Sequence, residues 1–518
     1  MPELPKPKTG AGLWARLPLK RPVVRLADLA HPASLKTWQV TAGAAALGLV
    51  VVAGALTAAG PWDSDGQRTA EARRATAGAP GGGADHGRPR PGGTPQPARS
   101  APEVLSALGS TAPDTHRATG TEPTEASLRR LLGPQLADAS LGEHRAAAVV
   151  DIATGHRLYG EDAGRSLTPA STTKLATAVA ALSAVGPGHR LTTRTVLQPG
   201  GHGTPRVVLV GGGDPTLTAR PDAAGNASLR KLAADTARRL AADKHDEISL
   251  GYDTGLYTGT EQHRIGPNEN LAPVTALLHD EGRLDDSTGG PAPRSTDPAA
   301  DTARTFAALL ADHGVRTRGR PAPASAGGKP EQLAAVHSPP LSALVERMLT
   351  QSDNDIAEHL ARHTALAAGK PADFAGGGAA VHARLAKLQL PLNGAHFADG
   401  SGLDRADRLT AGLLTSLLAT AGDKDHPELR SVLTGLPVAG FTGTLQNRYG
   451  GAEEAPATGL VRAKTGTLTG VNTLAGTVVD ADGRLLAFAF MTAGSTTPGP
   501  TQTSLDRLAT TLTTCGCG

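Results

Sequence analysis

The chain has 518 residues, of which 39% are hydrophobic and only 3% aromatic, so we expect a core built mainly from Ala, Val and Leu. This length is sufficient to bury a large core and allows more than one domain. The formal net charge of +3, from 51 basic and 48 acidic residues, is close to balance for this size and gives no indication of a nucleic-acid partner.

A basic segment followed by an apolar run opens the chain. Residues 1–37 carry seven lysines and arginines against two acidic residues. Residues 40–59 form a run of 20 uncharged residues with a tryptophan on each side, which is the length of a bilayer-spanning helix. By the positive-inside rule we expect a cytoplasmic segment at 1–37 and a single-pass signal-anchor at 38–62, with the rest outside the cell membrane. Cleavage at the small residues 57–59 is the alternative, which would release a secreted protein, and the long basic segment favours the anchor.

Residues 63–122 have the composition of a linker. They are rich in Gly, Pro, Ala and Arg and show no apolar periodicity; residues 78–83, for example, are Gly-Ala-Pro-Gly-Gly-Gly. Such a segment buries too little apolar surface to offset its ordering entropy. We therefore predict a disordered tether between the anchor and a folded domain.

The folded domain is predicted over residues 123–513, with a helix at 125–132 and two strands at 145–151 and 156–159. Next comes Ser171-Thr172-Thr173-Lys174, which opens the apolar run 175–182 and follows a proline. This pattern predicts a buried helix. Two residues three positions apart on a helix lie on one face, so the amine of Lys174 can take the hydroxyl proton of Ser171.

The middle of the chain contains further strand and helix patterns. Residues 206–210 predict a strand that runs into a glycine triplet, which has neither P-loop nor dinucleotide-binding spacing and therefore indicates a turn. Helical patterns recur at 229–240, 303–313 and 341–349, and the last leads directly into Ser352-Asp353-Asn354. Another Ser-x-x-Lys string, at 228–231, lacks the context of the first.

The C-terminal part predicts a strand and a hairpin around Lys464-Thr465-Gly466. Alternating runs at 474–479 and 485–491 flank Asp-Gly, which is a hairpin signal. Another Lys-Thr-Gly, at 8–10, precedes the apolar segment and has no such context. The two cysteines, Cys515 and Cys517, fall in a terminal Cys-Gly-Cys-Gly, so the body of the chain can build no disulfide framework or zinc site. We expect residues 514–518 to be a frayed tail.

The three strings, in this order, match the S-x-x-K, S-D-N and K-T-G elements of penicillin-recognising serine enzymes. Four accompanying segments strengthen the match: residues 209–217, 272–277, 399–403 and 436–445. Together they resemble the D-alanyl-D-alanine carboxypeptidase/endopeptidase family of class C low-molecular-mass penicillin-binding proteins, over roughly residues 123–512. The resemblance implies an α+β fold, a transpeptidase/β-lactamase-like antiparallel sheet flanked by helices. It also implies an inserted region between S-x-x-K and S-D-N, at approximately 195–335.

The residue types suit acyl transfer to a serine. A serine hydroxyl needs a neighbouring base, and Lys174 can be that base for Ser171 only when it is neutral. Burial beside a second cation, Lys464, would lower the lysine pKa in the required direction. Ser352 is suited to relay a proton to the leaving amine. Asn354 can hydrogen-bond both the substrate amide and Lys174.

The resemblance also implies the residues that bind the substrate or a penicillin. The backbone N–H groups of Ser171 and Thr467 would form the oxyanion hole. Asn472 is a further candidate for the edge of the pocket, with Thr469. The expected binders of the substrate and its carboxylate, besides Lys464, are Thr465, Gly466, Thr467 and Thr469.

Other polar residues are expected to be structural. Asp399-Gly400-Ser401-Gly402 predicts a turn, and Ser401 lacks the strand-to-helix elbow of a nucleophile. The 17 histidines, including His359 and His396, form no H-E-x-x-H or comparable motif, so we predict no metal and no cofactor.

The sequence thus predicts an exported, membrane-tethered serine carboxypeptidase that acts on peptidoglycan stem peptides through an acyl-enzyme at Ser171. The resemblance extends this to endopeptidase activity and to acylation by β-lactam antibiotics. Two alternatives remain open, a secreted serine β-lactamase and a catalytically silent cell-wall-binding scaffold. The accompanying segments and the insertion count against the first, and the intact catalytic strings count against the second.

Overall fold

The structure, a computed structural model, describes residues 122–199, 204–328 and 330–515. The predicted cytoplasmic segment 1–37, the anchor 38–62 and nearly all of the linker 63–122 lie outside these residues, as does Cys517. Within the described ranges no helix combines the length and the apolar character needed to cross a membrane.

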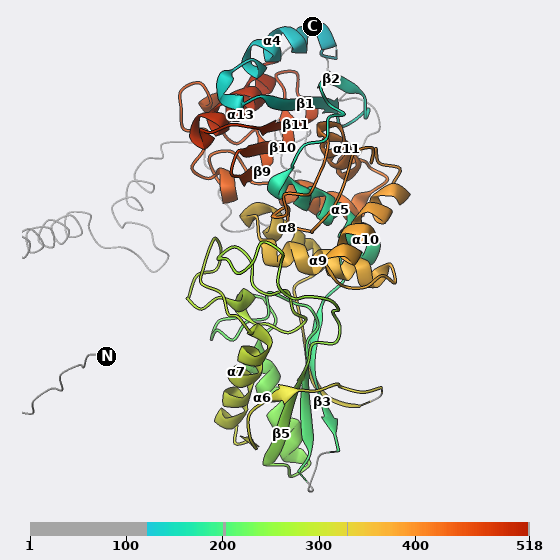
Figure 1. The fold of residues 1–518 in the computed structure, drawn as a ribbon, viewed down its shortest axis with the longest axis vertical. Helices are drawn as coiled ribbons and strands as arrows, with labels where there is room; N and C mark the ends of the chain where they lie inside the picture. Colours follow the sequence, from blue (N-terminus) through green and yellow to red (C-terminus); the bar gives the residue numbers. More distant parts are fainter. Residues whose placement is uncertain (1–121, 200–203, 329, 516–518) are drawn as a thin grey trace, which may run out of the picture. The chain divides into compact units, whose positions relative to one another are not determined.

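An antiparallel sheet of five strands is the centre of the main domain, in the order β2-β1-β11-β10-β9 (Figure 1). Strand β1 pairs with β11 along its whole length, so the first and the last strand of the sequence lie side by side. Both strands are buried on both faces, as their nearly continuous apolar composition requires. The strands of this sheet are β1 (His144–Asp151), β2 (Arg157–Glu161), β9 (Arg462–Leu468), β10 (Val471–Val479) and β11 (Leu485–Ala493).

Helices cover both faces of this sheet. On one face, α4 (Glu125–Leu136) and α13 (Pro498–Thr513) enclose a core that includes Phe488. The opposite face carries the larger core, which includes Leu175 and Leu414. The helices of that side are α5 (Thr173–Val185), α8 (Leu341–Gln351), α9 (Asn354–Ala367), α10 (Phe374–Lys387), α11 (Ala411–Gly422) and α12 (Arg430–Thr434). This arrangement confirms the predicted α+β fold.

The inserted region between α5 and α8 is built on a second sheet, in the order β6-β5-β4-β3-β8 with β7 paired to β5. Helices α6 (Leu229–Ala242) and α7 (Pro298–Asp312) pack against it around a core of its own, which includes Phe306. The insertion, predicted at approximately 195–335, therefore begins and ends with paired strands, β3 and β8. Its strands are β3 (Thr192–Gln198), β4 (Arg206–Val210), β5 (Glu247–Asp253), β6 (Arg316–Thr317), β7 (Ala322–Pro323) and β8 (Glu331–His337).

The described residues also form short 3-10 helices, and two of them, η4 and η8, lie beside β9. They are η3 (Ala139–Leu141), η4 (Ala170–Thr172), η6 (Asp280–Gly282), η7 (Pro427–Leu429), η8 (Gly443–Leu445) and η9 (Ala455–Ala457).

Two residues outside the main sheets test predictions made from the sequence. Ser228, in the other Ser-x-x-Lys string, is the N-cap of α6, and its hydroxyl accepts the N–H of Lys231 at 3.1 Å. Cys515 is buried in the core beneath α13, so the expectation of a frayed end is wrong for this residue.

Candidate active site

Ser171 lies in η4, immediately before α5 begins at Thr173. The predicted helix therefore starts with a 3-10 turn, and Ser171 and Lys174 still lie one turn apart. Two hydrogen bonds hold this turn, because the carbonyl of Pro169 accepts the hydroxyl of Thr172 at 2.7 Å and that of Thr473 at 2.8 Å.

Two glycines allow the rest of the main domain to approach this turn. A side chain at Gly466, in the K-T-G string, would overlap the hydroxyl of Thr473 and crowd the carbonyl of Pro169. At Gly402, where φ is +82°, a side chain would overlap the carbonyl oxygen of Ala170. The residues that flank the candidate nucleophile are thus fixed by β9 on one side and by the 399–402 turn on the other.

Lys174 is completely buried and makes three hydrogen bonds. Its Nζ lies 3.0 Å from Ser171 Oγ, 2.6 Å from Asn354 Oδ1 and 2.7 Å from the carbonyl oxygen of Ser401. Ser401 is therefore part of a turn, as predicted, and contributes to the site through its backbone.

Burial lowers the pKa of Lys174 to about 8, because the charged ammonium loses its hydration. Four carboxyl groups oppose this effect and raise the lysine pKa; in decreasing order they are Asp399, Glu358, Asp353 and Asp407. Lys464 is also fully buried, and burial together with the charge of Lys174 lowers its pKa well below the usual range. The direction expected for Lys174 is confirmed, and its cause is burial rather than the charge of Lys464.

Ser352, Asp353 and Asn354 form the sharp junction between α8 and α9. Ser352 ends α8 in the left-handed conformation, with φ of 59°, and Asp353 caps α9 by accepting the N–H of Ile356 at 3.0 Å. The string is therefore both a helix cap and part of the site. Lys464 Nζ donates to Ser352 Oγ at 2.9 Å, so the structure pairs Ser352 with Lys464 and Asn354 with Lys174.

A cavity of about 220 Å³ opens over these groups. Four of the predicted residues line it: Ser171, Ser352, Asn354 and Thr467. The inserted region forms part of its wall, and Asn354 Nδ2 donates to the carbonyl of one insertion residue, Asn270, at 2.9 Å. The lining residues from the insertion are Asn270, Arg283, Gly289, Gly290, Pro291 and Arg294.

The remaining predicted residues lie around the cavity rather than on its wall. Thr465 donates its hydroxyl to Thr444 at 2.8 Å, and the carbonyl of the exposed Thr469 accepts from Arg405 at 2.8 Å. Asn472 is buried, and its Oδ1 lies 3.5 Å from Gln502 in α13, so its assignment to the pocket edge is wrong. Position 472 shares a strand face with Leu474, which packs under α13.

Comparison with known proteins places this site in a family. The family model of D-Ala-D-Ala carboxypeptidase 3 (S13) matches residues 128–288 and 285–513. The chain belongs to the S13 carboxypeptidase family. Among S13 relatives, a carboxypeptidase of Mycobacterium tuberculosis is 36% identical over 409 residues, covering 77% of this chain and 86% of that protein. A D-alanyl-D-alanine carboxypeptidase of Actinomadura is 30% identical over 460 residues, covering 74% and 84%.

Solved structures agree on the fold of this S13 member. Penicillin-binding protein 4 of Haemophilus influenzae superposes with a TM-score of 0.61 at 22% identity, covering 73% of this chain and 97% of that chain. A second structure of the same protein, in complex with a β-lactam, has a TM-score of 0.58. The split match of the S13 family model is consistent with the inserted region.

Two buried groups of ionisable residues lie near this candidate active site, and the sequence did not reveal them. We name them the lysine-facing cluster, His263, Glu358 and Asp399, and the arginine-bound cluster, Glu281, Asp353 and Asp355. In each, the possible metal-ligand atoms lie within 4.8 Å of one another. Their oxygens are already engaged, by backbone N–H groups in the first and by arginines in the second, so neither offers a free set of donors for a metal.

The histidines in this S13 member that the sequence analysis singled out have no part in the site. His359 is buried, and its two ring nitrogens lie 2.7 Å and 3.1 Å from the backbone carbonyls of Asp355 and Thr275. Burial lowers its pKa to about 4, and the two carbonyls oppose this effect. His396 is exposed.

Proposed function

We propose that the protein is a serine-type D-alanyl-D-alanine carboxypeptidase that cleaves the terminal D-Ala-D-Ala bond of peptidoglycan stem peptides through an acyl-enzyme on Ser171. One observation carries the proposal: a fully buried amine, Lys174 Nζ, lies 3.0 Å from the hydroxyl of Ser171. The S13 family membership supplies the substrate class.

The hydrogen bonds of Lys174 orient it as a base. A neutral primary amine has two N–H donors and one lone pair. The carbonyl oxygens of Asn354 and Ser401 accept the two N–H groups, which leaves the lone pair directed at Ser171 Oγ. Lys174 would then take the hydroxyl proton as Oγ bonds to the carbonyl carbon of the penultimate D-alanine.

The leaving group must gain a proton as the peptide C–N bond breaks. Ser352 lines the cavity and is bonded to Lys464 Nζ at 2.9 Å. We assign to Ser352 the transfer of its proton to the leaving D-alanine amine, with reprotonation from the pair of buried lysines. Hydrolysis of the ester reverses the roles, because Lys174 takes a proton from the attacking water and Ser171 regains one.

Binding of the substrate is assigned to the β9 side of the cavity. Thr467 lines the cavity, and Lys464, fully buried, lies three residues earlier in the same strand. The N–H groups of Ser171 and Thr467 would stabilise the oxyanion. The carboxylate of the substrate, or of a penicillin, would meet Lys464, Thr465 and Thr467. Acylation by β-lactams and endopeptidase action on cross-linked stem peptides follow from the same site.

We place the catalytic domain outside the cell, attached by the apolar segment 38–62. The basic residues of 1–37 and the uncharged run that follows support this location. Protease accessibility of the C-terminal part in intact spheroplasts, with the N-terminal part protected, is the expected outcome.

The experiment that tests the proposed function is labelling of the full chain with a fluorescent penicillin, beside Ser171→Ala, over several hours. A persistent adduct that requires Ser171 is the expected result. An adduct that disappears within seconds would instead favour a β-lactamase. The absence of any adduct would favour a silent scaffold.

A further inference from the structure

The 399–402 turn presents its two sides to two different sets of groups. Its carbonyls face α5: that of Gly400 accepts Thr177 Oγ1 at 2.6 Å, and that of Ser401 accepts Lys174 Nζ at 2.7 Å. Its N–H groups face the opposite way, toward buried carboxylates. The N–H of Gly402 belongs to the same planar peptide group as the Ser401 carbonyl, and the N–H of Ser401 to that of the Gly400 carbonyl. The acceptor of the Gly402 N–H therefore fixes the carbonyl that Lys174 uses, and the acceptor of the Ser401 N–H fixes the neighbouring carbonyl of the turn.

Glu358 binds two of these N–H groups. It lies in α9 and is almost completely buried. Its Oε1 accepts the N–H of Gly400 at 3.2 Å and that of Ser401 at 2.8 Å, and Oε2 accepts the N–H of Gly400 at 3.1 Å. Charge-assisted bonds of this kind are stronger than neutral ones, which favours a fixed turn.

Asp399 binds the other end of the turn. Its Oδ1 accepts the N–H groups of Ser401 at 3.1 Å and Gly402 at 2.6 Å. Its Oδ2 accepts the N–H of Asp404 at 2.7 Å and the hydroxyl of Ser401 at 3.3 Å. A further donor, His263, comes from the inserted region.

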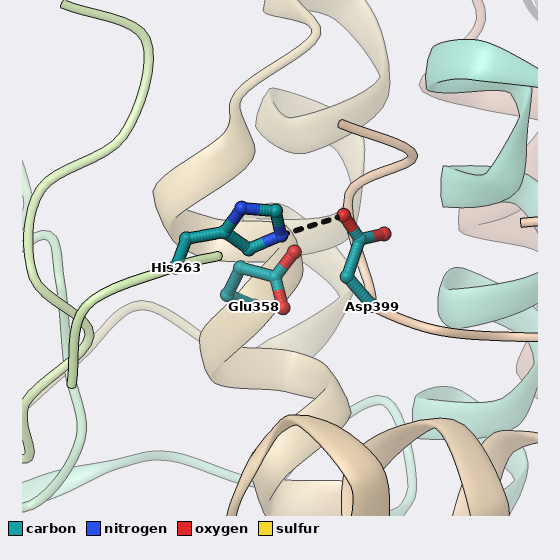
Figure 2. A group of neighbouring side chains, drawn as sticks. All are labelled: His263, Glu358 and Asp399. Carbon is teal, nitrogen blue, oxygen red and sulfur yellow. Dashed lines mark hydrogen bonds and ion pairs between the residues drawn. The ribbon is translucent and has the colours of Figure 1, made fainter. Parts of the chain in front are cut away.

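His263 is oriented so that it can donate to Asp399 (Figure 2). Its Nδ1 accepts the N–H of Ile265 at 3.2 Å, so Nε2 is the ring nitrogen that carries a proton toward Asp399. Nε2 lies 3.1 Å from Asp399 Oδ2, and the ring is buried. Figure 2 shows Glu358 beside this pair, and Glu358 lies in α9, the helix that begins at Asn354.

We propose that His263, Asp399 and Glu358 are positioning residues for Lys174: they hold the 399–402 turn so that the Ser401 carbonyl takes one N–H of the lysine and its lone pair stays on Ser171. The proposal rests on the proposed function of Lys174 as the base. It gives the inserted region a part in acylation, because His263 belongs to that region.

The charges of the cluster also act on Lys174. Asp399 and Glu358 are the two carboxyl groups that raise the lysine pKa most, against the larger effect of burial. Burial raises the pKa of Glu358 to about 7 and that of Asp407 to about 10, whereas hydrogen bonds from His263 and others hold that of Asp399 at about 2. The charged and titratable groups that act on the lysine or on these carboxyls are Glu358, Asp399, Asp407, Asp353 and His263, and Lys174 in turn acts on Lys464.

Glu358→Gln separates charge from geometry. The glutamine keeps Oε1, which accepts both turn N–H groups, and removes one negative charge that raises the pKa of Lys174. The rate constant for acylation by a fluorescent penicillin, measured from pH 6 to pH 10 and normalised to active sites, should therefore have its midpoint about one pH unit lower than in the wild type. A ¹³C-lysine NMR titration of Lys174 gives the same pKa without any acylation.

His263 tests the positioning part. His263→Leu removes the donor to Asp399, and we expect about tenfold slower acylation at the high-pH plateau. His263→Gln places an amide N–H near the position of Nε2 and should restore most of the rate. The matched control is His279→Leu, another histidine of the inserted region, whose Nδ1 lies 2.9 Å from the hydroxyl of Thr302. It should leave the plateau and the midpoint unchanged.

The outcomes separate this inference from the proposed function. A wild-type plateau and midpoint in both Glu358→Gln and His263→Leu, with Ser171-dependent acylation intact, would overturn the inference alone. If the wild type itself showed no Ser171-dependent acylation, the proposed function would be overturned. The NMR titration would still decide whether Glu358 acts on Lys174. Equal rate losses in His263→Leu, His263→Gln and His279→Leu would reduce the cluster to a stabilising contact.

Discussion

The two buried acidic clusters both connect the inserted region to the segments around the candidate site, but their charges are balanced differently. In the lysine-facing cluster, backbone N–H groups and one histidine bind Glu358 and Asp399. In the arginine-bound cluster, Glu281 is paired with Arg283 and Arg347, and Asp355 with Arg294 at 3.0 Å.

The first cluster acts on the pKa of Lys174, whereas the second holds the inserted region in place. Backbone dipoles carry no net charge, so the carboxylates beside the 399–402 turn keep a field that acts on Lys174. Arginines neutralise Glu281 and Asp355 where they lie, and the cluster then fixes the insertion to the Ser352–Asn354 junction. We therefore expect changes in the first cluster to alter the chemistry and changes in the second to alter stability.

The largest effect is expected when Lys174, the residue that the lysine-facing cluster positions, is replaced. Lys174→Met deletes the base while keeping a long apolar side chain in a buried position. Acylation should slow about 10³-fold, within the range for loss of a general base. The measurement is the acylation rate at pH 9, with circular dichroism to show that the variant is folded. A loss of less than tenfold would mean that another group deprotonates Ser171.

The arginine-bound cluster should show its effect in the free energy of unfolding. Arg294→Met leaves the buried carboxyl of Asp355 without its partner, which should destabilise the fold by about 3 kcal/mol in urea unfolding. Burial already raises the pKa of Asp355 to about 7, and Arg294 opposes that rise. Adding Asp355→Asn to Arg294→Met should recover part of the loss. Equal stability of Arg294→Met and the wild type would remove the distinction between the two clusters.

The pH profile of acylation by the wild type reports the pKa of Lys174, on which burial and the lysine-facing cluster act in opposite directions. Since the pKa of Lys174 is lowered to about 8, the base is neutral above that pH and protonated below it. Acylation should therefore rise about tenfold per pH unit below pH 8 and level off above it. Stopped-flow acylation between pH 6 and pH 10 measures this directly. A rate that falls as the pH rises through 8 would contradict a neutral lysine base.

The smallest change in the free energy of unfolding is expected for an exposed ion pair of the inserted region. Lys231 Nζ lies 2.6 Å from Asp235 in α6, with 66% of the lysine side chain exposed. Lys231→Ala should change the free energy of unfolding by no more than about 0.5 kcal/mol, because water and salt screen such pairs. A loss as large as that of Arg294→Met would show that charge removal anywhere in the insertion is destabilising.

Local patterns were sufficient to predict the parts of the site that lie within single elements. Ser171 and Lys174 are one turn apart across the junction of η4 and α5, Lys464 lies on a strand, and residues 206–210 form β4. Each of these depends on residues close in sequence, whose periodicity the chain shows. The resemblance to a known family supplied the order of the three strings and the presence of the insertion.

Contacts between distant residues could not be predicted in this way. His263, Glu358 and Asp399 meet only because the insertion packs against the junction of α9 and the 399–402 turn. Backbone groups such as the Ser401 carbonyl leave no mark in a sequence, because any residue type supplies one. The error at Asn472 has a different origin: strand alternation puts it on the same face as Leu474, but β10 is buried on both faces, so its sequence does not reveal which face lies under α13.

Removal of a terminal D-alanine through Ser171 is tested most directly by following D-alanine release from a peptide ending in D-Ala-D-Ala. The full chain and Ser171→Ala would be compared at pH 9, where Lys174 is neutral. We predict many turnovers by the wild type and no release by the variant. No release by a wild type that is acylated by penicillin, or undiminished release by Ser171→Ala, would contradict this function.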